Sequence, residues 1–209
     1  MLTAHIETCI QLTVDGGSET GEMYACHTVL LFYMPHLTRP TFVALPSTKN
    51  VVIERSWGHW LKFRGQTLRA AIQLGREQQY FNPADELHIS LFNWIWPKIV
   101  QQGVNDFVTY WNDHKTRTQK IANTPSGCSP NLVFDFPQNY GLLDCGIRVD
   151  QEDIAALRET IPRTREECYR WVSDEFDAAA KQAYAQLGSP TLSHTNGWQL
   201  FIDMARILG

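Results

Sequence analysis

Hydrophobic and polar residues alternate over residues 9–15, and several of them are β-branched. This alternation predicts a strand that ends at Asp15, because successive side chains of a strand point to opposite faces of a sheet. The glycines at positions 16–17 break the strand, a helix is expected over residues 19–32, and a second short strand is expected over residues 41–45. The inward face of the helix is predicted to consist of Met23, Tyr24, Cys26 and Leu30.

Apolar residues at steps of three and four follow the second strand and predict one long helix over residues 49–75. They are Ile53, Trp57, Trp60, Leu61, Leu68 and Ile72. Another helical pattern begins at Asn82 and continues to about Lys115. Pro97 is expected to kink or restart this helix, because proline removes a backbone donor and clashes with the preceding turn.

Turn-forming residues cluster over residues 124–130 and give the best candidate for a domain boundary. The expected domains are residues 1–120 and residues 121–209. The second part is predicted to be mainly α-helical, with helices that begin at Asp150, Ser173 and Asn196. The fold class is therefore expected to be α/β, with few strands and an α-helical C-terminal extension.

The composition places the chain among globular proteins, because 209 residues with 44% hydrophobic content can form one substantial core. No apolar stretch is long enough to span a membrane, and the first residues do not form a signal peptide. The five cysteines are an odd number and include no C-x-x-C pair, which favours reduced thiols over a disulfide framework or a zinc ribbon. A nuclear or cytoplasmic protein, neither secreted nor membrane-bound, is expected.

The net charge of −4 argues against a general nucleic-acid binder, but the charges are unevenly distributed. Residues 49–76 contain six basic residues and one acidic residue, whereas residues 121–209 contain seven basic and twelve acidic residues. The basic segment could contact a phosphate backbone, or it could be a solvated helix face. Charge alone leaves both interpretations open.

Two acidic residues are candidates for metal chemistry. Asp15 is followed by two glycines, so it is either an ordinary turn residue or a metal ligand at the carboxyl end of a strand, where α/β proteins bind their ligands. Glu54 falls near the start of the long helix, where the helix dipole favours an anion. It is either a solvated helix residue or a carboxylate that holds a divalent cation beside a phosphate.

The sequence around both acids resembles the retroviral-type integrase catalytic core. Residues 12–19 read LTVDGGSE and are similar to the segment around that family's second acidic residue. Residues 50–57 read NVVIERSW and are similar to the helix start that carries the third acid. Asp15 and Glu54 are 39 positions apart, which is close to the spacing expected of that pair. Similarity to a fungal group of integrase-core proteins continues downstream, at residues 82–83, 91–97, 110–114 and 142–145.

The resemblance implies an RNase H-like fold and a DDE-type polynucleotidyl transferase, in which three carboxylates hold two Mg²⁺ or Mn²⁺ ions. It assigns a catalytic and metal-binding role to Asp15 and Glu54. DNA is the implied partner, and the residues expected to contact it are Lys49, Asn50, Arg55, Lys62 and Arg64.

The sequence departs from the family pattern at the first acid. Only fourteen residues precede Asp15, and their one acid, Glu7, is too close to Asp15 to belong to a separate first strand. We therefore expect an N-terminally truncated core that is inactive alone, and a strand over residues 9–15 whose unpaired edge allows self-association. A non-catalytic domesticated DNA-binding module and a structural or protein-interaction helical domain are the alternatives.

Overall fold

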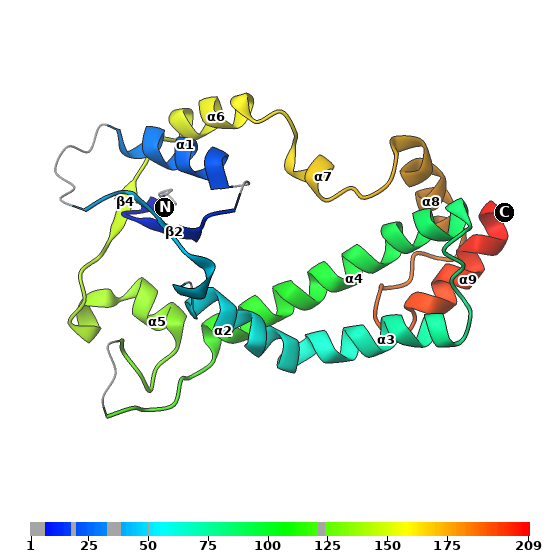
Figure 1. Ribbon diagram of the computed structural model, residues 1–209, viewed down its shortest axis with the longest axis horizontal. Coiled ribbons are helices and arrows are strands. Elements are labelled where there is room, and N and C mark those ends of the chain that lie inside the picture. Colours follow the sequence, from blue (N-terminus) through cyan, green and yellow to red (C-terminus); the bar gives the residue numbers. More distant parts are fainter. Residues whose placement is uncertain (1–6, 18–19, 33–38, 50, 121–123) are drawn as a thin grey trace. The chain divides into compact units, whose positions relative to one another are not determined.

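A computed structural model describes residues 7–17, 20–32, 39–49, 51–120 and 124–209 of the chain (Figure 1). The chain divides into two compact units, and each unit combines two separate segments. Unit 1 comprises Met1–Trp57 and Lys115–Pro162, and unit 2 comprises Gly58–His114 and Arg163–Gly209. Both units draw on residues from either side of position 120, so the division into domains 1–120 and 121–209 stays a prediction.

Unit 1 contains two sheets of two short strands among its described residues, and one of these sheets carries Asp15. β1 pairs antiparallel with β4, whereas β2 pairs in parallel with β3. The strands are β1 Glu7–Cys9, β2 Leu12–Asp15, β3 Phe42–Leu45 and β4 Gly146–Arg148. The strand predicted over residues 9–15 is confirmed only at Leu12–Asp15, because Cys9 ends β1, which pairs with β4, and residues 10–11 belong to neither strand. The strand predicted over residues 41–45 is confirmed over Phe42–Leu45.

Helix α1 (Thr20–Leu31) packs against β2, β3 and helix α6 (Gln151–Thr160). Its buried residues are His27 and Leu31, whereas two of the residues predicted to face inward, Met23 and Tyr24, are about half exposed. This part of the prediction was wrong, because a sheet of two short strands buries only part of the helix: His27 and Leu31, four positions apart, are buried, while Tyr24 contacts the Phe42 ring of β3, with the ring centroids 4.9 Å apart, and stays half exposed. The other helical segments of unit 1 are η1 Ser47–Lys49, the first part of α2 (Val51–Trp60), α5 Pro130–Asp135 and η3 Pro137–Tyr140.

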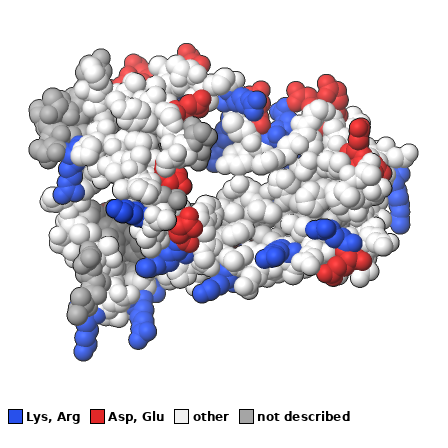
Figure 2. Space-filling view, in the orientation of Figure 1, with Lys and Arg blue, Asp and Glu red and all other residues white. Residues whose placement is uncertain are grey.

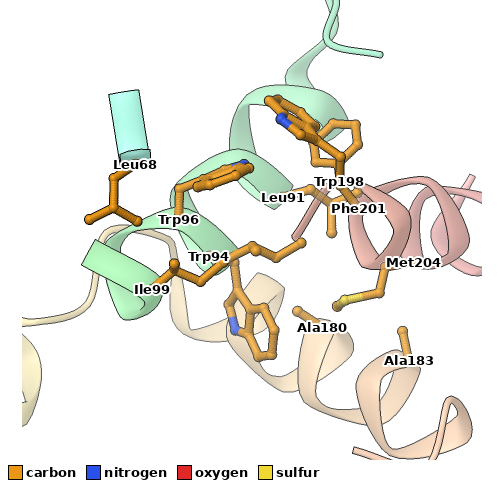
Figure 3. Close-up of a cluster of buried hydrophobic side chains, with 11 residues drawn as sticks. Leu68, Leu91, Trp94, Trp96, Ile99, Ala180, Ala183, Trp198, Phe201 and Met204 are labelled. Carbon is orange, nitrogen blue, oxygen red and sulfur yellow. The ribbon is translucent and has the colours of Figure 1, made fainter. Parts of the chain in front are cut away.

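Unit 2 is helical throughout its regular structure, and α4 is its central element. α4 packs against η2, α8 and α9, and α8 also packs against α9. Figure 3 shows the core that these helices enclose, in which Trp96, Phe201, Leu91, Ile95 and Met204 are the largest fully buried side chains. The segments are η2 Leu61–Gly65, α3 Gln66–Glu77, α4 Glu86–Asp113, α7 Arg165–Cys168, α8 Asp174–Gln186 and α9 Gly197–Leu208.

The long helix predicted over residues 49–75 is present as α2, a π-helical turn (η2) and α3, which follow one another without a break. Its apolar stripe is buried only in part. Leu68 is 3% exposed, whereas Ile53 and Trp57 on α2 are 41% and 53% exposed. The buried part therefore belongs to the core of unit 2, and the first part of the stripe remains open to solvent.

Helix α4 continues through Pro97 and does not restart there. Proline in a helix interior costs about 3 kcal/mol, because one backbone hydrogen bond is lost. Burial of one large apolar side chain contributes about 1.5–3 kcal/mol, and Trp94, Ile95, Trp96 and Ile99 around the proline are all buried. Packing around Pro97 thus outweighs its cost to the helix.

The described residues form a mixed α/β structure with few strands, as the sequence predicted, and residues 124–209 are mainly helical apart from β4. Within the part of the chain that the structure describes, no helix is long and apolar enough to cross a membrane.

Candidate metal and DNA-binding site

Asp15 lies where the parallel strands β2 and β3 end together. It is the last residue of β2 and is opposite Leu45, the last residue of β3. A hollow of about 610 Å³ opens at this end of the strands and is lined by Asp15, Gly16, Gly17, Ala44, Leu45 and Pro46. The carboxyl ends of parallel strands are the usual position of ligand sites in α/β sheets.

The Asp15 side chain is half-buried in the wall of this hollow. A Cβ atom added at Gly16 would meet no heavy atom within 4 Å, so packing does not require a glycine there. The absence of a side chain instead leaves the space beside Asp15 open. Among the described residues, nothing forms an ion pair or hydrogen bond with the Asp15 carboxylate.

Glu54 lies in the first turn of α2, as the sequence predicted. The chain reaches it from the end of β3 through Pro46 and η1. Its side chain is exposed, and the described part of the chain provides it with no ion-pair or hydrogen-bond partner. The positive end of the helix dipole stabilises a negative charge at this position.

Both acids belong to unit 1 and follow neighbouring strands of one sheet, but Glu54 does not line the hollow beside Asp15. In the described ranges, no group of three or more His, Cys, Asp or Glu residues is close enough to hold a metal ion. The structure therefore provides at most a pair of carboxylates at this end of the sheet.

The basic residues expected to contact DNA have different surroundings. Lys49 and Arg55 are exposed and belong to unit 1, close to Glu54 in sequence, whereas Lys62 and Arg64 belong to unit 2. Arg64 Nη2 lies 3.6 Å from Asp106 Oδ2, so part of its charge is already compensated. Asn50 lies outside the described residues. Figure 2 shows acidic side chains among the basic ones on the face drawn.

Sequence reasoning missed a thiol–imidazole pair in unit 1. His27 is 5% exposed, and its Nε2 atom lies 2.8 Å from the Cys9 carbonyl oxygen and 3.6 Å from Cys9 Sγ. Cys26 directly precedes His27 in the sequence, but neighbouring helix residues point in different directions and cannot pair. The partner is eighteen positions away, and nothing in the sequence signals the contact.

A second missed group surrounds Lys98 on α4. Its Nζ atom donates a hydrogen bond to the Trp94 carbonyl oxygen at 2.7 Å and lies 3.3 Å from the centre of the Trp94 ring. Burial lowers the pKa of the Lys98 amine to about 8; nearby Asp177 raises it, and Lys181 lowers it further. Asp177 comes from α8, far along the chain, so the sequence could not indicate this cluster.

Comparison with known proteins identifies the family of the chain. The family described as "Integrase core domain" matches residues 10–129, which is more than half of the chain and includes both Asp15 and Glu54. No curated protein and no solved structure matches the chain. The resemblance read from residues 12–19 and 50–57 is confirmed at the level of the family, and the chain belongs to the integrase core domain family.

Proposed function

We propose that this integrase- or transposase-derived chain binds DNA beside a divalent metal ion that Asp15 and Glu54 hold, and that it does not transfer DNA strands by itself. The observation that carries this proposal is the parallel pairing of β2 with β3. Asp15 at the end of β2 is opposite Leu45 at the end of β3, and the chain continues from Leu45 through η1 to α2 and Glu54. We also propose that β2, β3 and α1 correspond to part of an RNase H-like core. Similarity to the fungal group and N-terminal truncation stay predictions.

Integrase core domains generally use divalent metal ions, and the chemistry of the two acids suits Mg²⁺ or Mn²⁺. Both ligands are carboxylate oxygens, which hard divalent cations prefer. Mg²⁺ is often held by only one or two carboxylates, with water and substrate phosphates as further ligands. The unpartnered Asp15 side chain beside an open hollow supports such a site.

Two carboxylates do not support the full reaction. A bound pair of ions activates the attacking oxygen and stabilises the leaving oxygen of an in-line displacement. The described residues around Asp15 and Glu54 include no third acid, so the site has too few carboxylate ligands to hold two adjacent ions in position. Misplacement by about 1 Å can cost about a hundredfold in rate, so we expect strand transfer to be undetectable with this chain alone.

The experiment measures metal and DNA binding separately. Mn²⁺ binding is followed by electron paramagnetic resonance, and binding of a fluorescent DNA duplex is followed by anisotropy with and without Mg²⁺. Asp15→Asn and Glu54→Gln should each weaken Mn²⁺ binding at least tenfold and remove the effect of Mg²⁺ on DNA affinity. Glu22→Gln is the matched control, because Glu22 is also an exposed acid in the first turn of a helix.

The basic residues of unit 1 provide the DNA contact in this proposal. Replacing Lys49 and Arg55 with Ala should weaken binding to all duplex sequences alike and reduce the salt slope by about 0.9 for each lost phosphate contact. An unchanged slope would move the DNA-binding surface elsewhere on the chain.

A non-catalytic DNA-binding module is the second candidate, and the position of Glu54 outside the hollow favours it. It predicts that Asp15→Asn and Glu54→Gln leave DNA affinity unchanged, in Mg²⁺ or without it. Absence of DNA binding even at low salt would contradict both candidates and leave a structural or protein-interaction domain.

A further inference from the structure

Two adjoining hollows in unit 2 meet at Lys98, away from Asp15 and Glu54. The smaller has a volume of about 190 Å³ and walls of mixed polarity that include Asp177 and Lys181. The larger has a volume of about 590 Å³ and mainly apolar walls. Residues common to both walls are Asn93, Pro97, Lys98, Tyr169 and Trp171. A volume of this size suits a small organic molecule.

The Lys98 ammonium forms no ion pair with the described carboxylates, although Asp177 is close enough to raise the pKa of its amine. Asp177 is the nearest acid in the cluster, but both of its oxygens are already used. Asp177 Oδ2 lies 2.7 Å from Lys181 Nζ, and Oδ1 accepts a hydrogen bond of 2.8 Å from Trp94 Nε1. Among the described residues, no carboxylate lies within ion-pair distance of Lys98. Asp177 is thus the acid near both lysines, and it forms an ion pair only with Lys181.

The larger hollow also has an unpartnered donor in its wall. Trp96 is 1% exposed and lines this hollow, and its Nε1 atom is buried with no hydrogen-bond partner in the described structure. A buried indole N–H usually has a partner. Figure 3 shows Trp94 directed toward α8 and Trp96 on the other side of α4, toward Leu68 and Trp198. The Trp94 ring therefore lines the smaller hollow, and the Trp96 ring lines the larger one.

The rim of the larger hollow is aromatic and open. Trp171 and Tyr169 lie between α7 and α8, line both hollows and are 64% and 52% exposed. Large exposed aromatic side chains around a hollow are typical of ligand sites, because they cover apolar ligand surface with little loss of side-chain entropy.

We propose that this cavity binds a small organic anion, with its aromatic or branched aliphatic body in the apolar hollow and its carboxylate on the Lys98 ammonium. The anion supplies the directly contacting carboxylate that Lys98 lacks among the described residues. The site uses neither DNA nor a metal ion, so it is independent of the function proposed above.

The proposal fixes how binding depends on pH. The charged groups that line the smaller hollow are Lys98, Glu166, Arg170, Asp177 and Lys181. Arg170 pairs with Asp174 and Lys181 with Asp177, which leaves Lys98 as the cation that titrates with ligand binding. A carboxylate favours protonated Lys98, so affinity should be constant below pH 8 and fall as the pH rises above it.

The test uses 2-naphthoate as the probe and 2-naphthylmethanol as its uncharged counterpart, with affinity measured by titration calorimetry at pH 7. A single charge-assisted contact should make the acid bind about tenfold more tightly than the alcohol. Lys98→Gln should remove this difference, Lys98→Arg should retain most of it, and Lys62→Gln, at an exposed lysine of the same unit, should change nothing.

Wild-type protein alone also tests the proposal. Equal affinities for acid and alcohol, no detectable binding of 2-naphthoate at millimolar concentration, or an acid affinity that does not fall above pH 8 would each overturn it.

Discussion

Gly75 shows how closely individual residues of unit 2 are fitted. The indole of Trp198 lies against its backbone, so an added Cβ atom would come within 1.9 Å of Trp198 Cε2. The same indole donates a hydrogen bond of 2.7 Å to the Ala71 carbonyl oxygen. The absent side chain of one residue on α3 thus determines where a large side chain of α9 lies.

Gly75→Ala should therefore destabilise the protein by about 1–3 kcal/mol, because Trp198 must leave its position. Gly58→Ala is the matched control, since Gly58 is also helical but has no atom within 4 Å of an added Cβ. The control should be neutral or stabilising by up to about 1 kcal/mol. Urea unfolding of both variants measures the difference, and equal stabilities would contradict the packing argument.

The buried amine of Lys98 should make the free energy of unfolding depend on pH. Burial lowers the pKa of its amine from 10.5 to about 8, so the folded state binds fewer protons than the unfolded state between these values. The contribution of Lys98 to the free energy of unfolding should therefore rise with pH from about 8 to 10.5. Lys98→Met should show a smaller rise than the wild type in urea unfolding across this window. Parallel pH profiles would contradict this explanation.

At the scale of the element, the three residues predicted to begin helices in the C-terminal part occupy N-cap positions, but only Ser173 makes a side-chain capping bond. Ser173 caps α8, and its hydroxyl accepts a hydrogen bond of 3.2 Å from the Phe176 backbone N–H. Asp150 occupies the same position before α6 but makes no side-chain capping bond. Two caps with the same sequence signature thus differ in their contacts.

Ser173→Ala should cost about 1 kcal/mol of stability, because the N–H of Phe176 loses its acceptor. Asp150→Ala should cost less, since only the interaction of its charge with the helix dipole is lost. Chemical denaturation of the two variants compares them directly. A larger effect at Asp150 would show that the capping bond does not determine the start of α8.

At the scale of the whole molecule, burial is unequal between the units. The described residues of unit 1 include only His27, Leu31 and Ser129 as buried side chains, whereas the core cluster of unit 2 joins α3, α4, α8 and α9. Apolar burial contributes about 25 cal/mol per Å², so unit 2 provides most of the stabilisation that the described structure shows. Several large apolar residues of unit 1 are exposed, and they include Val52, Phe32, Phe134 and Leu143.

We expect amide hydrogen exchange to separate the units. Backbone amides of α4 and α9 should be the slowest to exchange, while those of β1, β2, β3 and β4 should exchange several orders of magnitude faster, because local opening exposes little buried surface there. Mass spectrometry of peptides from both units measures this. Equal protection of the strands and α4 would contradict the expectation.

Self-association is the other prediction at this scale. β2 has β3 on one side, and the described residues place no strand on its other side. An open strand edge can pair with another chain. Sedimentation velocity should therefore show association that increases with protein concentration, and a monomer at all concentrations would contradict the prediction.

Local patterns in the sequence predicted much of the secondary structure and both candidate acids. The 3.6-residue period gave the long helices, Asp15 before two glycines marked a strand end, and Ser173 marked a helix start. These features depend on residues that are close in sequence, where backbone preference and side-chain periodicity act directly. The motifs around Asp15 and Glu54 also identified the integrase family, because the family match covers both.

Contacts between distant residues were decided only by the tertiary structure. Cys9 pairs with β4 whereas Leu12–Asp15 pairs with β3, His27 instead of Met23 is buried, and Asp177 lies near Lys98. The local sequence pattern does not predict these contacts, because each one depends on which segments, far apart in the sequence, pack against each other. The sequence alone thus determined the helices, the family and the candidate acids, while the packing of separate segments determined which carboxylates, thiols and amines have partners.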